Sequence, residues 1–284
     1  MPDTAGANGA LDGATALVTG AARGQGRAVA RALARRGATV WATDLCGPSE
    51  TAPYPMADLE DLDETAWLVR EDGGICRTAV LDVRDPAAVT RLVDRIARET
   101  GRLDVLITCA GIVGFAPVSE LTDEQWSDML ATNLTGTFHC VRAVVPHMAA
   151  RRSGRIVAVS SMSGRQGTPN LAHYSASKWG VIGLIKSVAL EYAELGVTAN
   201  VICPTNVDTP MLHNPALYSL FAPDLEEPSR DEVEERYARM SPMRVPWCPP
   251  EAIADAVDHL VGESRRYVTG SVLDVGLGGT ARMP

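Results

Sequence analysis

The stretch Ala14-Thr15-Ala16-Leu17-Val18-Thr19-Gly20-Ala21-Ala22-Arg23-Gly24-Gln25-Gly26 decides the fold of this chain. Its first six residues predict a short buried strand, and the glycines that follow predict a tight turn. Apolar residues then recur at helical spacing from 27 to 36, and the apolar run at 39–43 predicts a second strand that ends at Asp44. This order of strand, turn, helix and strand is the building unit of a parallel sheet.

The alternation of strand and helix patterns continues through the 284 residues of the chain. Further strands are expected at 78–81, 105–107, 155–160, 197–202 and 271–275. Further helices are expected at 59–70, 86–100, 123–150, 174–195, 231–240 and 250–262. The order predicts an α/β fold, a Rossmann-type doubly wound parallel sheet with helices on both faces.

Prolines and polar residues interrupt the alternation in two places, near 46–74 and near 208–249. We interpret both as insertions in a single domain over 13–284, which follows a flexible N-terminus over 1–12. In a doubly wound sheet, ligands bind at the edge where the strands end. Both insertions directly follow strands, so we expect them to lie at that edge.

The glycine turn is typical of a dinucleotide site. Gly20, Gly24 and Gly26 permit a tight turn and let backbone N–H groups approach a pyrophosphate at the start of a helix. Asp44 ends the next strand, where a carboxylate accepts hydrogen bonds from ribose hydroxyls and repels a 2′-phosphate. This favours NAD over NADP. Two alternatives stay open: Asp44 as an ordinary turn residue, and Arg23 as the ligand of a 2′-phosphate.

Other strand ends carry residues suited to the same cofactor. Asp82 ends the third strand, where its carboxylate either accepts from an adenine amino group or caps the next turn. The small residues Cys109-Ala110-Gly111 end the fourth strand and would let a cofactor pass closely.

Tyr174 and Lys178 form the most informative pair of polar residues. The chain has only two lysines, Lys178 and Lys186, so a lysine one helical turn after a tyrosine is unlike the rest of the composition. Positions four apart share a helix face, and an ammonium beside a phenol lowers the pKa of the phenol. The pair then predicts an acid/base group near neutral pH, and the alternative is a surface lysine that reaches to water.

Together these motifs resemble the short-chain dehydrogenase/reductase family over nearly the whole chain, from about 13 to 279. The resemblance rests on the glycine turn, Cys109-Ala110-Gly111, Asn133, Ser161 thirteen residues before Tyr174, Lys178, and Pro204-Thr205. Thr108-Cys109 stand where the family usually has two asparagines, and Pro204-Thr205 where it usually has Pro-Gly. Neither departure removes a catalytic group.

The resemblance implies hydride transfer between nicotinamide and a carbinol carbon. It implies a catalytic set of Asn133, Ser161, Tyr174 and Lys178, in which the phenolate takes the alcohol proton and Asn133 orders a water. The implied cofactor contacts are Gly20, Arg23, Gly24, Gln25, Gly26, Asp44, Leu45, Asp82, Val83, Cys109, Ala110, Gly111, Tyr174, Lys178, Pro204, Thr205, Val207 and Thr209.

Residues 54–62 and 204–211 look like the mycofactocin-coupled, carveol-dehydrogenase-like subfamily. That resemblance implies tightly held NAD, which mycofactocin reoxidises. An insertion directly after Asp44 is well placed to cover the adenosine half, although a surface loop without a role is the alternative. The second insertion resembles a substrate lid, and its apolar side chains suit an apolar, cyclic terpene-like alcohol. Packing at an oligomer interface is the other explanation for those side chains.

Composition narrows the remaining possibilities. The net charge of −9 and the absence of a basic patch argue against a nucleic-acid partner. No apolar run is long enough to span a membrane, and the six cysteines and five histidines lack metal-ligand spacing. We therefore expect a cytoplasmic protein without a metal. By the resemblance it is a homotetramer, and its partners are a small alcohol or ketone and mycofactocin as electron acceptor.

Two rival interpretations remain. An ordinary reductase that exchanges NAD(P) and acts on ketones or 3-ketoacyl groups needs no insertion after Asp44. A non-catalytic NAD-binding sensor needs no intact tyrosine, lysine and serine, all three of which this chain has.

Overall fold

The computed structural model of the chain describes residues 11–262 and 266–282, so most of the expected flexible N-terminus lies outside the described residues. The described strands form one parallel sheet in the order β3-β2-β1-β4-β5-β6-β7. They are β1 Thr15–Thr19, β2 Thr39–Asp44, β3 Ile75–Val80, β4 Val105–Thr108, β5 Gly154–Val159, β6 Val197–Pro204 and β7 Val272–Val275. The order reverses between β1 and β4, which creates a crevice at their carboxyl ends.

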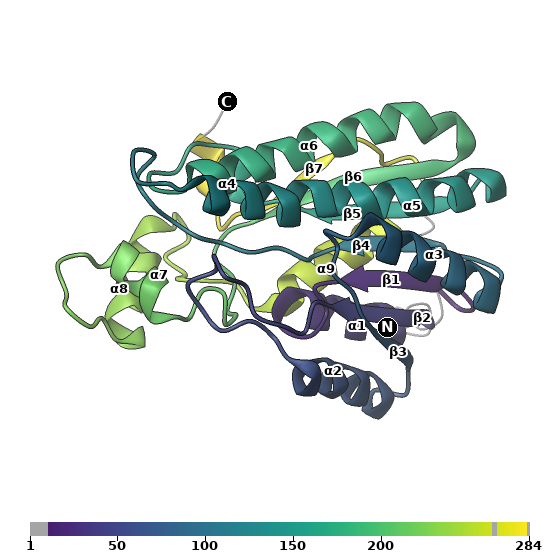
Figure 1. Ribbon diagram of the computed structural model, residues 1–284, viewed down its shortest axis with the longest axis horizontal. Helices are drawn as coiled ribbons and strands as arrows, with labels where there is room; N and C mark the ends of the chain where they lie inside the picture. Colours follow the sequence, from purple (N-terminus) through teal and green to yellow (C-terminus); the bar gives the residue numbers. More distant parts are fainter. Residues whose placement is uncertain (1–10, 263–265, 283–284) are drawn as a thin grey trace, which may run out of the picture.

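Helices cover both faces of the sheet, as the sequence predicts (Figure 1). One face packs against α1 Gly24–Arg35, α2 Leu59–Glu71 and α9 Pro250–Val261. The other packs against α3 Pro86–Thr100, α5 Gly136–Arg151 and α6 Ala172–Tyr192, with α4 Asp123–Leu130 beside α6. Two helices of the second insertion, α7 Pro215–Phe221 and α8 Arg230–Met240, project beyond the sheet at one end (Figure 1).

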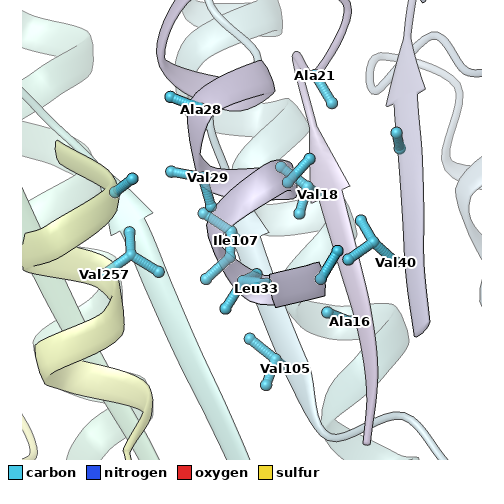
Figure 2. Packing of buried hydrophobic residues seen from close by; sticks show 14 of the residues in the cluster. Ala16, Val18, Ala21, Ala28, Val29, Leu33, Val40, Val105, Ile107 and Val257 are labelled. Atoms are coloured by element: carbon cyan, nitrogen blue, oxygen red, sulfur yellow. The ribbon is translucent and has the colours of Figure 1, made fainter. Parts of the chain in front are cut away.

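The core on the α1 side fixes where the glycine turn lies. Val29 and Leu33 of α1 and Val257 of α9 lie against the strand residues Val18 and Ile107 (Figure 2). All five side chains are at most 1% exposed. Complete burial of such a side chain stabilises the fold by about 1.5–3 kcal/mol. This packing holds the first turn of α1 directly above the end of β1.

The strand expected at 78–81 was misplaced, because β3 runs over Ile75–Val80. It is an edge strand, which pairs only with β2. Ile75 and Val80 at its two ends are 60% and 58% exposed. An edge strand with exposed apolar ends and an arginine in its middle lacks the continuous apolar run by which a buried strand is recognised.

The long helix expected at 123–150 was wrong in its middle. A π-helical turn, η2 Ala131–Thr135, separates α4 from α5, and Asn133 lies within it. Apolar periodicity does not reveal one extra residue in a turn, and such turns are frequent at functional sites. The lid also contains α7, which the sequence analysis did not predict.

No helix in residues 11–262 and 266–282 combines the length and apolar character that a membrane crossing requires.

Candidate active site

The glycine turn is shaped by steric necessity. A Cβ atom on Gly20 would lie 2.6 Å from the backbone nitrogen of Ala110, and one on Gly26 would lie 2.0 Å from the carbonyl oxygen of Gly20. Gly24 has a φ of +56°, and a Cβ there would lie 3.0 Å from a methyl carbon of Thr209. The turn therefore lies tightly between the end of β4 and the segment after β6, with its backbone open to a ligand.

Asp44 lies at the end of β2, beside this turn. Its carboxylate accepts hydrogen bonds from the N–H groups of Ala22, at 3.0 Å, and Leu45, at 2.8 Å. Burial raises the pKa of Asp44, and these backbone bonds oppose that effect. A carboxylate has about four acceptor positions, so capacity remains for ribose hydroxyls. The residues present thus fit the adenosine half of NAD.

Asp82 takes one of the two roles that the sequence left open, because it caps the turn after β3. Its carboxylate accepts from the N–H of Arg84 at 2.9 Å, which caps the turn after β3, and it pairs with the Arg84 guanidinium. It also lines the crevice. Its position permits contact with adenine without showing one.

Most of the predicted cofactor residues meet in one crevice at the carboxyl ends of β1 to β5. From the predicted set, the crevice is lined by Gly20, Arg23, Gly24, Gln25, Gly26, Asp44, Leu45, Asp82, Val83, Cys109, Ala110, Gly111, Tyr174, Lys178 and Thr209. Pro204, Thr205, Val207 and Ser161 line an adjoining cavity instead. Tyr174 and Thr209 line both spaces, so they lie where the two spaces meet.

Lys178 and Tyr174 lie side by side on α6, as the spacing predicts. The Lys178 Nζ is 5.6 Å from the centre of the Tyr174 ring and donates to the carbonyl oxygen of Val159 at 3.0 Å. Lys178 is only 6% exposed. The helix is positioned by Ser160, whose hydroxyl donates to the Lys178 carbonyl oxygen at 2.8 Å.

The expected lowering of the phenol pKa is wrong for this structure. Burial raises the pKa of Tyr174, and a hydrogen bond with the Ser161 hydroxyl opposes that effect only in part. Burial also lowers the pKa of Lys178 to about 8. The physical reason is that a dry environment disfavours phenolate and ammonium alike, whereas the sequence reveals only their attraction.

Ser161 lies beside Tyr174, and Asn133 and Lys178 both lie near Gly111. Ser161 begins the short turn η3 Met162–Gly164, and its hydroxyl accepts from the N–H of Ser163 at 3.1 Å. Asn133 is 1% exposed and is held by Ile112, with its Oδ1 accepting at 2.8 Å and its Nδ2 donating at 3.0 Å. Its Nδ2 also lies 3.2 Å from the Ser177 hydroxyl. The Asn133 side chain thus connects α6 to the segment that follows β4. Its expected water-ordering role stays a prediction.

The adjoining cavity has a volume of about 330 Å³, within the range of sites for small organic ligands. The segment that begins at Ser161 contributes polar groups to its lining. The lid contributes apolar side chains, which are Met211, Leu212, Leu217, Phe221, Tyr237 and Met240. A carbinol group at Tyr174 and Ser161 would therefore lie against polar groups, with its hydrocarbon part against the lid.

Several lining residues were missed by the sequence analysis. Ser49, Tyr54 and Met56, from the first insertion, line the cofactor crevice, as do Arg84 and Asp128. Tyr54 is 7% exposed, and its hydroxyl accepts from the N–H of Val113 at 3.2 Å. Burial raises the pKa of Tyr54 to about 12. The only signal in the sequence was an aromatic residue between prolines in an otherwise polar loop.

Nothing in the described part of the chain forms a group of three or more His, Cys, Asp or Glu side chains placed to hold a metal ion.

Comparisons with known proteins agree with this geometry. The family model for short chain dehydrogenases matches residues 14–216. The (−)-trans-carveol dehydrogenase of Rhodococcus erythropolis is 39% identical over 96% of this chain and 99% of its own. The crystal structure of carveol dehydrogenase from Mycobacterium avium with NAD is 40% identical, covering 97% of this chain and 100% of that one, with a TM-score of 0.94. A variant of the actinorhodin polyketide ketoreductase, with NADPH, is 34% identical, covering 94% and 97%, with a TM-score of 0.84.

Proposed function

This chain belongs to the short chain dehydrogenase family, and from that premise we propose that it is an NAD-dependent oxidoreductase that interconverts an apolar secondary alcohol and its ketone. One observation carries the proposal: Tyr174 lies where the cofactor crevice meets an apolar cavity, with Lys178 on the crevice side and Ser161 on the cavity side.

The residues have distinct roles in this reaction. NAD held by the crevice residues would supply the hydride acceptor for alcohol oxidation and, in its reduced form, the hydride donor for ketone reduction. In oxidation, the Tyr174 phenolate takes the proton of the alcohol, and the Ser161 hydroxyl bonds the substrate oxygen, where charge changes most. Burial makes the Tyr174 phenolate unfavourable. The Lys178 ammonium offsets part of that cost by its opposite charge.

NAD is favoured over NADP by the position of Asp44 at the end of β2, where its charge repels a 2′-phosphate. Arg23, the residue that would hold such a phosphate, donates through its guanidinium to the carbonyl oxygen of Pro55 in the first insertion. Most of the guanidinium hydrogen-bonding capacity remains, so the preference rests mainly on Asp44. The carveol dehydrogenase of Mycobacterium avium was crystallised with NAD.

We further propose that NAD is held tightly and is reoxidised in place by mycofactocin. The cover segment, which we define as residues 47–57, supports this proposal because it contributes Ser49, Tyr54, Met56 and Ala57 to the crevice wall. It is anchored on one side through Pro55 and on the other through Tyr54. A cofactor beneath such a segment would leave only when the segment moves.

The preferred substrate in this proposal is a compact apolar alcohol, such as a cyclic terpene alcohol. The lid side of the cavity is formed by methionine, leucine and aromatic side chains, which suit a hydrocarbon skeleton. Two relatives at 39% and 40% identity are carveol dehydrogenases.

An ordinary reductase that exchanges NAD(P) is the second candidate. This candidate is supported by the variant of the actinorhodin polyketide ketoreductase, which is 34% identical and was crystallised with NADPH. The cover segment argues for the coupled enzyme, because free exchange of cofactor does not require an anchored cover. A non-catalytic sensor is the weakest candidate, since tyrosine, lysine and serine meet at one point.

The proposed assembly is a homotetramer in the cytoplasm. The exposed apolar side chains of Trp126 on α4, Phe138 on α5, and Trp179 and Leu190 on α6 support association through these helices. The six cysteines are free, which suits a reducing compartment. Sedimentation analysis tests the assembly directly.

The decisive experiment is extensive dialysis of the purified protein, then denaturation and identification of released nucleotide by ultraviolet and mass spectra. Stoichiometric NAD, together with alcohol oxidation that needs an artificial electron acceptor, is the expected result. An empty protein that turns over with free NAD or NADP would replace the coupled enzyme by the ordinary reductase. Failure to oxidise or reduce any apolar alcohol or ketone with either assay would reject both.

A further inference from the structure

A polar cluster on the rim of the crevice has no part in the proposed chemistry. Arg84 lies in the turn after β3, Asp128 lies on α4, and Thr51 lies in the cover segment. Asp128 is 44 residues from Arg84 and 77 residues from Thr51 in the sequence. The fold thus brings three distant segments to one carboxylate.

The two oxygens of Asp128 serve different partners. Its Oδ1 accepts from the Arg84 Nη1 at 2.7 Å, and its Oδ2 accepts from the hydroxyl of Thr51. The Ser49 hydroxyl lies 3.4 Å from the same Oδ2 and accepts the N–H of Ala52 at 3.1 Å. The Asp128 side chain is 16% exposed. Hydrogen bonds to a charged, partly buried acceptor are stronger than those between neutral groups.

Arg84 holds Asp128 in place and is itself held. Its Nε and Nη2 bond both carboxylate oxygens of Asp82, at 2.9 to 3.1 Å, which leaves Nη1 for Asp128. The positive charge therefore lies between two carboxylates and offsets their repulsion. Asp82, Arg84, Asp128 and Ser49 all line the crevice. The anchor of the cover segment is thus part of the crevice wall.

We propose that Asp128 is a positioning residue that fastens the cover segment through Thr51, and that this contact limits the rate at which the dinucleotide leaves. The cover segment lacks helix and strand, so nothing in its own backbone pairing holds it closed. The inference rests on the proposed function only in that the crevice holds a dinucleotide.

The test compares the rate of NAD release from the parent with the rates from Thr51→Val and Asp128→Ala. Each protein is loaded with NAD, and release is followed after dilution into an enzyme that consumes free NAD. Loss of a hydrogen bond to a charged group predicts release about ten- to a hundredfold faster in both variants. The double variant should release NAD no faster than Asp128→Ala alone, because both changes break the same contact.

Matched controls are Thr90→Val on α3 and Asp123→Ala on α4, which change the same residue types at exposed positions outside the crevice lining. Both should release NAD at the parent rate. Hydrogen exchange of residues 47–57 gives a second measurement, and exchange should be faster in Thr51→Val, which keeps the side-chain shape.

Parent-like release and parent-like exchange in Thr51→Val would overturn the inference. The comparison is a ratio of rates, so it can be made whether the parent holds NAD tightly or weakly. Weak retention by the parent would count against coupled turnover while leaving the ratio to judge the role of Asp128.

Discussion

The cover segment and the substrate lid, residues 208–249, lie at the same edge of the sheet, yet the balance of forces that hold them differs. Polar contacts to separate parts of the crevice rim hold the cover segment through Thr51, Tyr54 and Pro55, beside a small apolar cluster of Tyr54 with Val113 and Leu171. The lid instead has an apolar core of its own, in which Val233 and Tyr237 are completely buried. Tyr237 packs against the rings of Phe221 and Trp247, at centroid distances of 4.8 and 6.1 Å.

The lid also has a polar cluster at its start, centred on His213. His213 lies 2.7 Å from the carboxylate of Asp208 and 2.7 Å from the hydroxyl of Tyr218. Burial and the nearby Arg230 lower the pKa of His213, and Asp208 opposes this. This cluster connects the start of the lid to α7, and the remainder is held by its apolar core and by the ion pair of Arg236 with Asp224.

This contrast agrees with the ligand proposed for each region. Directional hydrogen bonds favour one closed position of the cover segment, which would suit a cofactor that is the same in every turnover. Apolar packing is non-directional, and methionine side chains adapt to irregular shapes, which suits a substrate whose outline varies. Breaking single contacts should therefore affect the two regions differently.

The largest effect is expected at Tyr174, where the two regions meet. Tyr174→Phe removes the acid/base hydroxyl and keeps the ring, so turnover should fall by about 10²–10⁴-fold or more. NAD retention after dialysis should stay at the parent level, since no contact of the cover segment is lost. Steady-state kinetics and nucleotide content check the two halves separately, and substantial residual turnover would refute the role of the phenol.

The buried Lys178, which lines the crevice, should make the free energy of unfolding depend on pH. Because burial lowers its pKa from 10.5 to about 8, the unfolded chain binds more protons than the folded chain between those values. Stability of the parent should therefore rise with pH in that window, relative to Lys178→Met. Below pH 8 the full cost of the buried charge is present, so the stability of the parent relative to Lys178→Met should be about 3 kcal/mol lower there than above pH 10.5.

Denaturant unfolding of both proteins near pH 7 and near pH 10 measures this difference in the free energy of unfolding. The free energy of the parent relative to Lys178→Met should be higher at the higher pH. A relative free energy that stays constant or falls would contradict the assignment of a lowered pKa to Lys178.

Phe115 contacts both the cover segment and the lid, so its removal tests whether the two regions act independently. It packs against the lid cluster and also against the cluster that contains Tyr54 of the cover segment. Phe115→Ala should loosen both regions by about 1–3 kcal/mol in total, because a half-buried ring loses part of the free energy of a buried one. NAD release and the KM for an apolar alcohol should both rise several-fold. A change in only one of them would show that the regions act independently.

The smallest effects are expected for substitutions of two buried tyrosines, Tyr54 and Tyr237. The hydroxyl of Tyr54 accepts the Val113 N–H, whereas that of Tyr237 has no partner among the described residues. Tyr54→Phe leaves a buried N–H unpaired and should cost about 1 kcal/mol, seen as faster NAD release. Tyr237→Phe removes an unpaired polar atom and should leave stability unchanged or slightly raised. Equal losses of stability in both variants would contradict the inference that the Tyr54 hydroxyl contributes a hydrogen bond and the Tyr237 hydroxyl does not.

Much of the fold was accessible from the sequence, for reasons that differ between elements. The helix at 86–100 was placed correctly because a proline in its first turn and a glycine after its end mark its bounds. β3 was misplaced because an edge strand has little continuous apolar character. The π-turn around Asn133 was missed because apolar periodicity does not register one added residue.

The candidate site likewise contains residues that the sequence indicated and residues that it did not. Gly20, Asp44, Tyr174 and Lys178 were identified because each stands at a fixed position in a local motif, after a strand or one helical turn from its partner. Asp128 and Arg84 carry no such local signal. Their contact appears only when the turn after β3 and α4 come together at the crevice rim.

The parallel sheet, the glycine turn and the order of the candidate catalytic residues could be derived from the sequence alone, because periodicity, turn chemistry and spacing are local properties of the chain. Three features followed only from the three-dimensional packing: the direction in which the Tyr174 pKa shifts, the contacts that hold the cover segment, and the apolar lid residues that line the adjoining cavity. Burial and long-range hydrogen bonds depend on which segments meet in space, and that follows from the packing of the whole sheet.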